Sequence, residues 1–270
     1  MYQLIAFDMD GTLLRSDHTI DPETVAALGR ADEAGKTVVL ATGRSASELQ
    51  DYLPVLPMVR YGVLASGGLI YDFSTETVLA KKSLSAEVVA TVCDLLDRED
   101  VFVVVMADGQ GYVQSSQFNR IEAFYMEQFR QLYLDTAVFV SDLNQLLAEK
   151  ACEKINIYFK TPELREAYAD QLASSAITLV KAERTGLELT AQGADKGAGL
   201  QLLCQRLGFG MAEVIGVGDS DNDRTMLQES GMGLAMGNAK PSIKALANHV
   251  VPTNDEGGCV EAIERYLLRS

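Results

Sequence analysis

Residues 5–14 read IAFDMDGTLL, and this short stretch carries the strongest indication of the fold. An apolar run ends in two carboxylates, Asp8 and Asp10, which are followed by Gly11 and Thr12. A short apolar run bounded by turn residues is typical of a buried strand. Open α/β sheets bind their ligands at the carboxyl ends of the strands. The segment therefore predicts a buried strand with two carboxylates at its ligand-binding end.

Two aspartates one residue apart suit a nucleophile beside an acid–base group, and they also suit a site for a hard cation such as Mg²⁺. An ordinary Asp-rich turn is the alternative for this segment alone, because Asp and Gly are common turn residues. A calcium-binding loop would need Glu at its twelfth position. Counted from Asp8, the twelfth residue is Thr19, so the calcium-binding loop is excluded.

The composition limits the classes of protein to which the chain can belong. Its 270 residues are 47% hydrophobic and 23% charged, which is typical of a globular protein with a full core. The formal net charge of −15 disfavours nucleic acid and anionic lipid as partners, but not a small anionic substrate. No apolar run approaches the ~20 residues that a membrane-spanning helix needs.

Cysteine and histidine are sparse, which disfavours several kinds of site. The two histidines, His18 and His249, lie far apart, so neither a His-rich zinc site nor a Ser-His-Asp triad is expected. The N-terminal segment Met1–Gln3 shows no signal-peptide pattern. We therefore expect a cytoplasmic protein with reduced thiols. The scattered cysteines are Cys93, Cys152, Cys204 and Cys259.

Strands and helices alternate in the first ~80 residues and again in the last third, which predicts a parallel sheet with right-handed crossovers. Asp21 and Pro22 are placed to start the first helix, and Gly35 to end it. The expected strands are Leu4–Phe7, Thr37–Ala41, Val63–Ala65, Val214–Val217, Gly233–Ala235 and His249–Val251. The expected helices are Pro22–Ala34, one from about Ser45, one after Lys196 and one ending near Glu229.

The middle of the chain has a different pattern, in which strands also come in pairs. Val101–Met106 and Tyr112–Ser115 flank the hairpin signal Ala-Asp-Gly-Gln-Gly. We expect further strands at Lys154–Phe159, Ile177–Ala182 and Leu187–Thr190, and helices at Ser85–Asp97 and from Pro162. This pattern predicts an α+β module with an antiparallel sheet at residues 83–185. The sheet domain would then be made of residues 1–82 and 186–270.

Four polar loops each follow an apolar strand or open a helix of the expected sheet domain. The first contains Asp8 and Asp10. The second is Thr42-Gly43-Arg44, whose hydroxyl and backbone N–H groups suit a phosphate oxygen. The third places Lys196 at a helix start, and the fourth, Gly218–Asp223, carries three carboxylates. Alone, each has an ordinary alternative: a common tripeptide, a surface lysine, or a turn with a helix cap.

A doubly wound sheet brings these loops to one edge. Clustered carboxylates without a cation would repel one another and raise each other's pKa values. Mg²⁺ is the simplest resolution, and sites of this kind are common in phosphate chemistry.

The chain resembles the haloacid dehalogenase-like (HAD) phosphatases, in particular the Cof-type branch with a large type-II cap. Residues 8–12 match the first motif, Thr42-Gly43-Arg44 the second, Lys196 the third and Gly218–Asp223 the fourth. Other segments that look like this branch are Met226-Leu227, Met236-Gly237-Asn238-Ala239 and Asn254–Val260. The chain departs from the branch at Ser66-Gly67-Gly68, usually Asn-Gly-Ala, and at Asp195, where Ser or Asn is common.

The resemblance implies a Rossmann-like doubly wound parallel sheet core with an inserted α+β cap, and Mg²⁺ as cofactor. Asp8 would be the nucleophile that forms an aspartyl-phosphate, and Asp10 the acid and base. Lys196 would bind phosphate and offset the charges around Asp8. Mg²⁺ would be held by Asp8, the backbone carbonyl of Asp10 and Asp219, and Asp223 would support the waters of the metal.

The resemblance also implies contacts to substrate. Thr42, Gly43, Lys196 and Asn222 would bind phosphate oxygens. Arg44 would contact substrate or cap, or serve only the local structure. In the cap, candidates for substrate contact are the hairpin at Asp108–Tyr112 and the segment Ser115–Tyr125.

The expected partner is a small phosphorylated metabolite, such as a sugar phosphate, flavin mononucleotide or pyridoxal phosphate, and the protein would be a monomer or small homo-oligomer. Two other functions stay open: a phosphomutase or phosphotransferase of the same superfamily, and a catalytically silent binding protein. A dinucleotide-binding protein is disfavoured, because no Gly-x-Gly-x-x-Gly follows the first strand.

Overall fold

Strand β1 (Leu4–Phe7) lies inside an eight-stranded sheet with the order β14-β13-β12-β1-β2-β3-β4-β5. The computed structural model describes residues 1–269. All four residues of β1 are buried, and β1 pairs in parallel with β12 and with β2. The other strands are β2 (Thr37–Ala41), β3 (Tyr61–Leu64), β4 (Leu69–Asp72), β5 (Thr77–Lys81), β12 (Val214–Gly218), β13 (Met232–Ala235) and β14 (His249–Val250).

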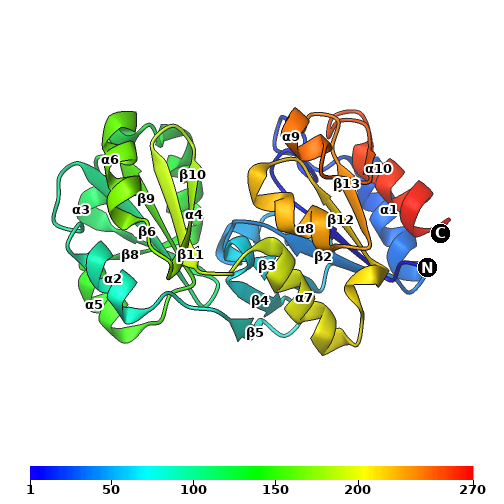
Figure 1. The fold of residues 1–270 in the computed structure, drawn as a ribbon, viewed down its shortest axis with the longest axis horizontal. Helices are drawn as coiled ribbons and strands as arrows, with labels where there is room; N and C mark the ends of the chain where they lie inside the picture. The colour runs from blue at the N-terminus through cyan, green and yellow to red at the C-terminus, as the bar shows by residue number, and fades with distance from the viewer. Residues whose placement is uncertain (270) are drawn as a thin grey trace. The chain divides into compact units, whose positions relative to one another are not determined.

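The strand order reverses between β1 and β12, because the chain passes from β1 to β2 on one side and reaches β12 on the other only later. Helix α1 (Pro22–Glu33) packs with α10 (Gly258–Glu261), and α7 (Lys196–Leu207) packs with α8 (Arg224–Glu229). These two pairs cover opposite faces of the sheet (Figure 1). A short helix, α9 (Pro241–Lys244), precedes β14. The predicted doubly wound sheet is confirmed, and its switch point is the expected ligand-binding edge.

A second unit contains a six-stranded sheet with the order β10-β11-β9-β6-β7-β8. Its pairs are antiparallel except for β7 with β8. The strands are β6 (Val101–Ala107), β7 (Gln110–Gln114), β8 (Ala137–Val140), β9 (Lys154–Phe159), β10 (Ile177–Ala182) and β11 (Gly186–Ala191). The helices are α2 (Ala86–Cys93), α3 (Ser115–Phe118), α4 (Arg130–Thr136), α5 (Leu143–Glu149) and α6 (Pro162–Leu172).

Strand β6 is buried on both faces, which explains why its sequence is continuously apolar rather than alternating. Val101 and Val103 face one hydrophobic cluster, and Phe102 and Val104 face another. The predicted hairpin is confirmed: Ala107 pairs with Gln110 across a two-residue turn, Asp108-Gly109, in which both residues have positive φ (54° and 83°). Asn-Gly and Asp-Gly turns with this backbone match the twist of paired strands.

The two units are made of separate parts of the chain. The first contains residues 1–43, 51–79 and those from Asp195 onward, and the second contains residues 44–50 and 80–194. Our boundaries at residues 83 and 185, and the interpretation of the second unit as a cap, stay predictions. No helix within residues 1–269 combines the length and apolar character needed to cross a membrane.

Three details of the sequence interpretation are corrected. The helix expected from Ser45 is wrong, because that region forms only 3-10 turns at Ser47–Leu49 and Leu53–Val55. Ser45 donates its N–H and hydroxyl to Glu48, a contact typical of a helix start, but Pro54 lies shortly after and has no N–H with which to continue a helix. Asp21 occupies the N-cap position of α1 but makes no capping hydrogen bond. The strands β4 and β5 were not anticipated.

Candidate active site

Asp8 and Asp219 lie side by side because they follow adjacent parallel strands. Phe7 at the end of β1 pairs with Val217 in β12, and the N–H of Asp8 donates to the Val217 carbonyl over 3.0 Å. Asp8 is the first residue after β1, and Asp219 is the first after β12. The strand reversal therefore places two carboxylates at the edge where doubly wound sheets bind ligands.

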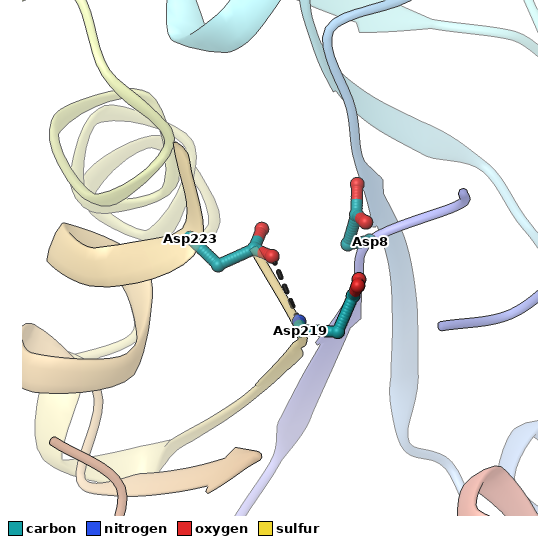
Figure 2. A group of neighbouring side chains, drawn as sticks. All are labelled: Asp8, Asp219 and Asp223. Atoms are coloured by element: carbon teal, nitrogen blue, oxygen red, sulfur yellow. Dashed lines mark hydrogen bonds between the residues drawn. The ribbon is translucent and has the colours of Figure 1, made fainter. Parts of the chain in front are cut away.

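Asp223 completes a group of three carboxylates (Figure 2). One oxygen from each of Asp8, Asp219 and Asp223 lies within 4.8 Å of the others. Asp223 is fully buried, and its Oδ2 accepts hydrogen bonds from the N–H groups of Asp219 and Ser220, both over 2.9 Å. A Cβ at Gly218 would lie 2.4 Å from the Asp223 carboxyl carbon, so this approach requires glycine. Asp223 thus holds the loop that carries Asp219.

Lys196 joins the two ends of this group. It is fully buried, and its ammonium donates to Asp8 Oδ1 over 2.5 Å and to Asp223 Oδ1 over 2.6 Å. The lysine is the first residue of α7, and Asp195 caps that helix by accepting from the Ala198 N–H over 2.9 Å. Asp195, a departure from the usual motif, therefore fixes the helix turn from which Lys196 extends.

The charges of the site are unbalanced. Burial, followed by the charge of Asp223, raises the pKa of Asp8 well above its usual value, although Lys196 opposes the shift. Burial and Asp223 also raise the pKa of Asp219 to about 6. Burial alone would lower the pKa of Lys196, but the charges of Asp223 and Asp8 outweigh it and raise that pKa. Three carboxylates sharing one ammonium provide the oxygen-rich, electronegative surroundings that suit a hard divalent cation.

Thr12 also contacts this group of carboxylates, although the sequence had indicated no separate role for it. Its hydroxyl donates to Asp219 Oδ1 over 3.0 Å and so links the loop after β1 to the loop after β12. Gly11 has a φ of +79°, and a Cβ there would lie 2.7 Å from Asp219 Oδ2. The only sequence signal for either contact is the Gly-Thr pair that follows Asp10.

The remaining predicted residues have varied surroundings. Thr42 is buried, its N–H donates to the Val63 carbonyl, and its own carbonyl accepts from the Ser66 N–H over 3.0 Å. Asn222 is half-buried and accepts from the Ser220 hydroxyl. Gly43 is also half-buried, Asp10 is exposed in the loop after β1, and Arg44 belongs to the second unit. The structure thus brings Asp8, Lys196, Asp219 and Asp223 into direct contact or close proximity.

Ser66 adopts a left-handed conformation, with φ 55° and ψ 34°. Asn tolerates this conformation better than most residues other than Gly, which gives a backbone reason for the Asn usual at this position. Gly67, with φ +94°, allows a close approach, since a Cβ there would lie 2.0 Å from the Asp195 carbonyl oxygen.

Comparisons with known proteins agree with this geometry. A family model described as haloacid dehalogenase-like hydrolase matches residues 5–263. The chain belongs to this family. An HMP-PP phosphatase of Serratia proteamaculans (strain 568) is 32% identical over 255 residues, which cover 91% of this chain and 88% of that protein. The 5-amino-6-(5-phospho-D-ribitylamino)uracil phosphatase YcsE of Bacillus subtilis (strain 168) is 27% identical over 267 residues, which cover 98% and 96%.

A solved structure of a haloacid dehalogenase-like hydrolase from Bacteroides thetaiotaomicron matches with a TM-score of 0.84 and 28% identity, covering 98% of this chain and 99% of that one. The predicted family, the fold class and the assignment to phosphatase-type hydrolases are therefore confirmed.

Proposed function

We propose that this chain is an Mg²⁺-dependent phosphatase that hydrolyses small phosphomonoesters through an aspartyl-phosphate on Asp8. The observation that carries the proposal is the contact of Asp8 with Lys196 beside Asp219 and Asp223, at the switch point of the sheet. The phosphatase relatives support the reaction class, and their differing substrates support a small phosphorylated metabolite as the partner.

Asp8 is suited to be the nucleophile. Its backbone is fixed by the Val217 carbonyl, and one carboxylate oxygen is bound by Lys196. In the first step an Asp8 oxygen would bond to phosphorus as the ester P–O bond breaks, with Asp10 protonating the leaving oxygen. In the second step water would attack phosphorus and give its proton to Asp10, while the bond between Asp8 and phosphorus breaks and phosphate is released. The exposure of Asp10 is compatible with proton exchange with solvent.

The residues present fit a magnesium ion. Asp8 and Asp219, together with the backbone carbonyl of Asp10, would hold it, and both carboxylates have raised pKa values that a cation would lower. When bound, Mg²⁺ neutralises phosphoryl charge and orients the group. Both oxygens of Asp223 already accept hydrogen bonds, which supports a role in holding Lys196, Asp219 and the waters of the metal.

Phosphate oxygens would be bound by Thr42, Gly43, Lys196 and Asn222. Lys196 already binds two carboxylates, so its contact with substrate would accompany some release of these bonds. Arg44 remains a candidate for substrate contact. The second unit, as the predicted cap, would supply the contacts that select the leaving group.

Phosphate release from a panel of phosphomonoesters tests the proposal. The panel contains sugar phosphates, flavin mononucleotide, pyridoxal phosphate and p-nitrophenyl phosphate, each assayed with Mg²⁺ and with a chelator. Asp8→Asn should abolish release, because an amide is a poor nucleophile, whereas Asp32→Asn, the same change at an exposed position of α1, should not. Near-normal release by Asp8→Asn would refute the mechanism. A phosphorylated second product with little free phosphate would instead favour a phosphotransferase.

A further inference from the structure

Two asparagines from distant parts of the sequence hold the backbone that follows Asp8. Asn238 Nδ2 donates to the Gly11 carbonyl over 2.7 Å, and Asn254 Nδ2 donates to the Leu14 carbonyl over 2.9 Å. The two are linked to each other, because the N–H of Asn254 donates to Asn238 Oδ1 over 3.1 Å. Asn238 and Asn254 thus form a brace, a continuous chain of hydrogen bonds that joins Gly11 to Leu14 across the loop after Asp8.

The brace acts on the backbone of Asp10. Gly11 directly follows Asp10, and Asp10 itself forms a backbone bridge with Leu14. The loop backbone sets the position and direction from which the Asp10 side chain extends. Holding the carbonyls of Gly11 and Leu14 therefore restricts the backbone of Asp10 in two ways, through the next residue in the chain and through its bridge partner.

Other side chains near the C-terminal end of the sequence also bind the loop after Asp8 and the residues next to it. The thiol of Cys259 donates to the Thr12 carbonyl over 3.3 Å, and Asp255 accepts from the N–H and the hydroxyl of Ser16. The carbonyls of Gly11, Thr12 and Leu14 are thus bound by side chains that lie more than 220 residues away in the sequence.

We propose that Asn238, supported by Asn254, is a positioning residue that places the carboxyl group of Asp10 for proton transfer to the leaving group. This role rests on the proposed phosphatase function. A carboxamide carries a donating NH₂ group and an accepting oxygen, and Asn238 uses both groups in this brace. A carboxylate of nearly the same shape keeps the acceptor and loses the donor.

The test is Asn238→Asp, assayed as kcat/KM on two substrates. An alkyl phosphate needs its leaving oxygen protonated, while p-nitrophenolate leaves with little help. Proton transfer contributes roughly 10²–10⁴-fold to such rates, so a misplaced Asp10 should lower kcat/KM about tenfold or more for the most active alkyl phosphate of the panel. The loss for p-nitrophenyl phosphate should stay within about threefold. Hydrogen exchange in a peptide covering residues 8–16 should become faster.

Asn248→Asp is the matched control, because Asn248 is also exposed and its side-chain oxygen accepts a hydrogen bond from the Gly233 N–H, which Asp preserves. Asn248→Asp should leave kcat/KM unchanged for both the alkyl phosphate and p-nitrophenyl phosphate. Equal losses on both substrates, or none, in an Asn238→Asp protein with normal circular dichroism would overturn the role of Asn238 alone. Wild-type protein that releases no phosphate from any ester would overturn the proposed function, and this role with it.

Discussion

Each unit of the chain buries a lysine against carboxylates, but the two lysines lie in different parts of their sheets. Lys196 starts a helix near the ends of β1 and β12 and binds Asp8 and Asp223. Lys154 is the first residue of β9, a strand flanked on both sides, and its ammonium pairs with Glu188 of the adjacent strand β11 over 2.8 Å.

We infer from the difference that a buried lysine does not by itself mark an active site. The Lys154–Glu188 pair joins opposite charges on neighbouring strands, an arrangement that stabilises sheets. Around Lys196 the carboxylates outnumber the ammonium, and the pKa values of Asp8 and Asp219 are raised. An excess of like charge at strand ends is what indicates a site for cation and phosphate.

Among the variants that test this contrast, the largest effect is expected for Lys196→Ala. Asp8 and Asp223 would stay buried without their ammonium, so we expect kcat/KM to fall about 10³-fold and the free energy of unfolding to fall by about 3 kcal/mol without Mg²⁺. Phosphate release and urea unfolding measure the two effects. Lys240→Ala, which removes an exposed partner of Asp221, is the control and should cost less than about 1 kcal/mol. Unchanged kinetics in Lys196→Ala would remove this lysine from the site.

A loss of stability without a comparable loss of activity is expected for Lys154→Met. Removing one member of a buried ion pair costs about 3 kcal/mol, and Lys154→Met/Glu188→Leu should recover much of it, because a well-packed apolar pair can replace a buried ion pair. Urea unfolding of both variants tests this. If kcat/KM fell far more than stability, Lys154 would lie at a ligand site and the contrast between the two lysines would fail.

We expect Glu153 to give the second unit a pH-dependent stability. Its buried carboxylate accepts from the Asp108 N–H over 2.8 Å, and burial raises its pKa to about 7. The folded protein therefore keeps this proton to higher pH than the unfolded chain, so the stabilisation is complete below pH about 4.5 and is lost as pH rises through about 7.

Urea unfolding across that pH range should show the loss in wild type, about 3 kcal/mol at most, and a flatter profile in Glu153→Gln. Glu149→Gln, at an exposed position of α5, should keep the wild-type slope. Identical slopes in all three proteins would show that Glu153 does not titrate in this range.

The smallest effect concerns the link between the two loops of the site. Thr12→Val removes the hydroxyl that binds Asp219, so we expect a stability loss of about 1 kcal/mol and a roughly tenfold lower affinity for Mg²⁺. Thr12→Ser keeps the hydroxyl and should restore the affinity for Mg²⁺. A valine variant that binds Mg²⁺ as tightly as wild type would show that Asp219 needs no such support.

The close approach of Asp8, Asp219 and Lys196 was predictable from sequence because each stands at a strand end or a helix start. Asp8 and Asp219 follow apolar strands, Lys196 opens a helix, and a parallel sheet brings such positions together. The central strands of both sheets were also predictable, since their apolar runs are bounded by turn residues.

The rest depended on contacts that no local pattern reports. Thr12 reaches Asp219 across 207 residues, and Asn238 reaches Gly11 across 227. The helix expected from Ser45 is replaced by short 3-10 turns, the second of which contains Pro54, although Ser45 and Glu48 make a contact typical of a helix start.

The most direct test of the account compares Asp219→Asn with Asp221→Asn in phosphate release over a range of Mg²⁺ concentrations. The two carboxylates lie two residues apart in one loop, but Asp219 lies beside Asp8 whereas Asp221 is exposed and pairs with Arg224 and Lys240. We predict that Asp219→Asn raises the Mg²⁺ concentration for half-maximal rate at least tenfold, as expected for loss of a ligand, and that Asp221→Asn leaves it unchanged. Equal Mg²⁺ requirements in the two variants would contradict the assignment of this site.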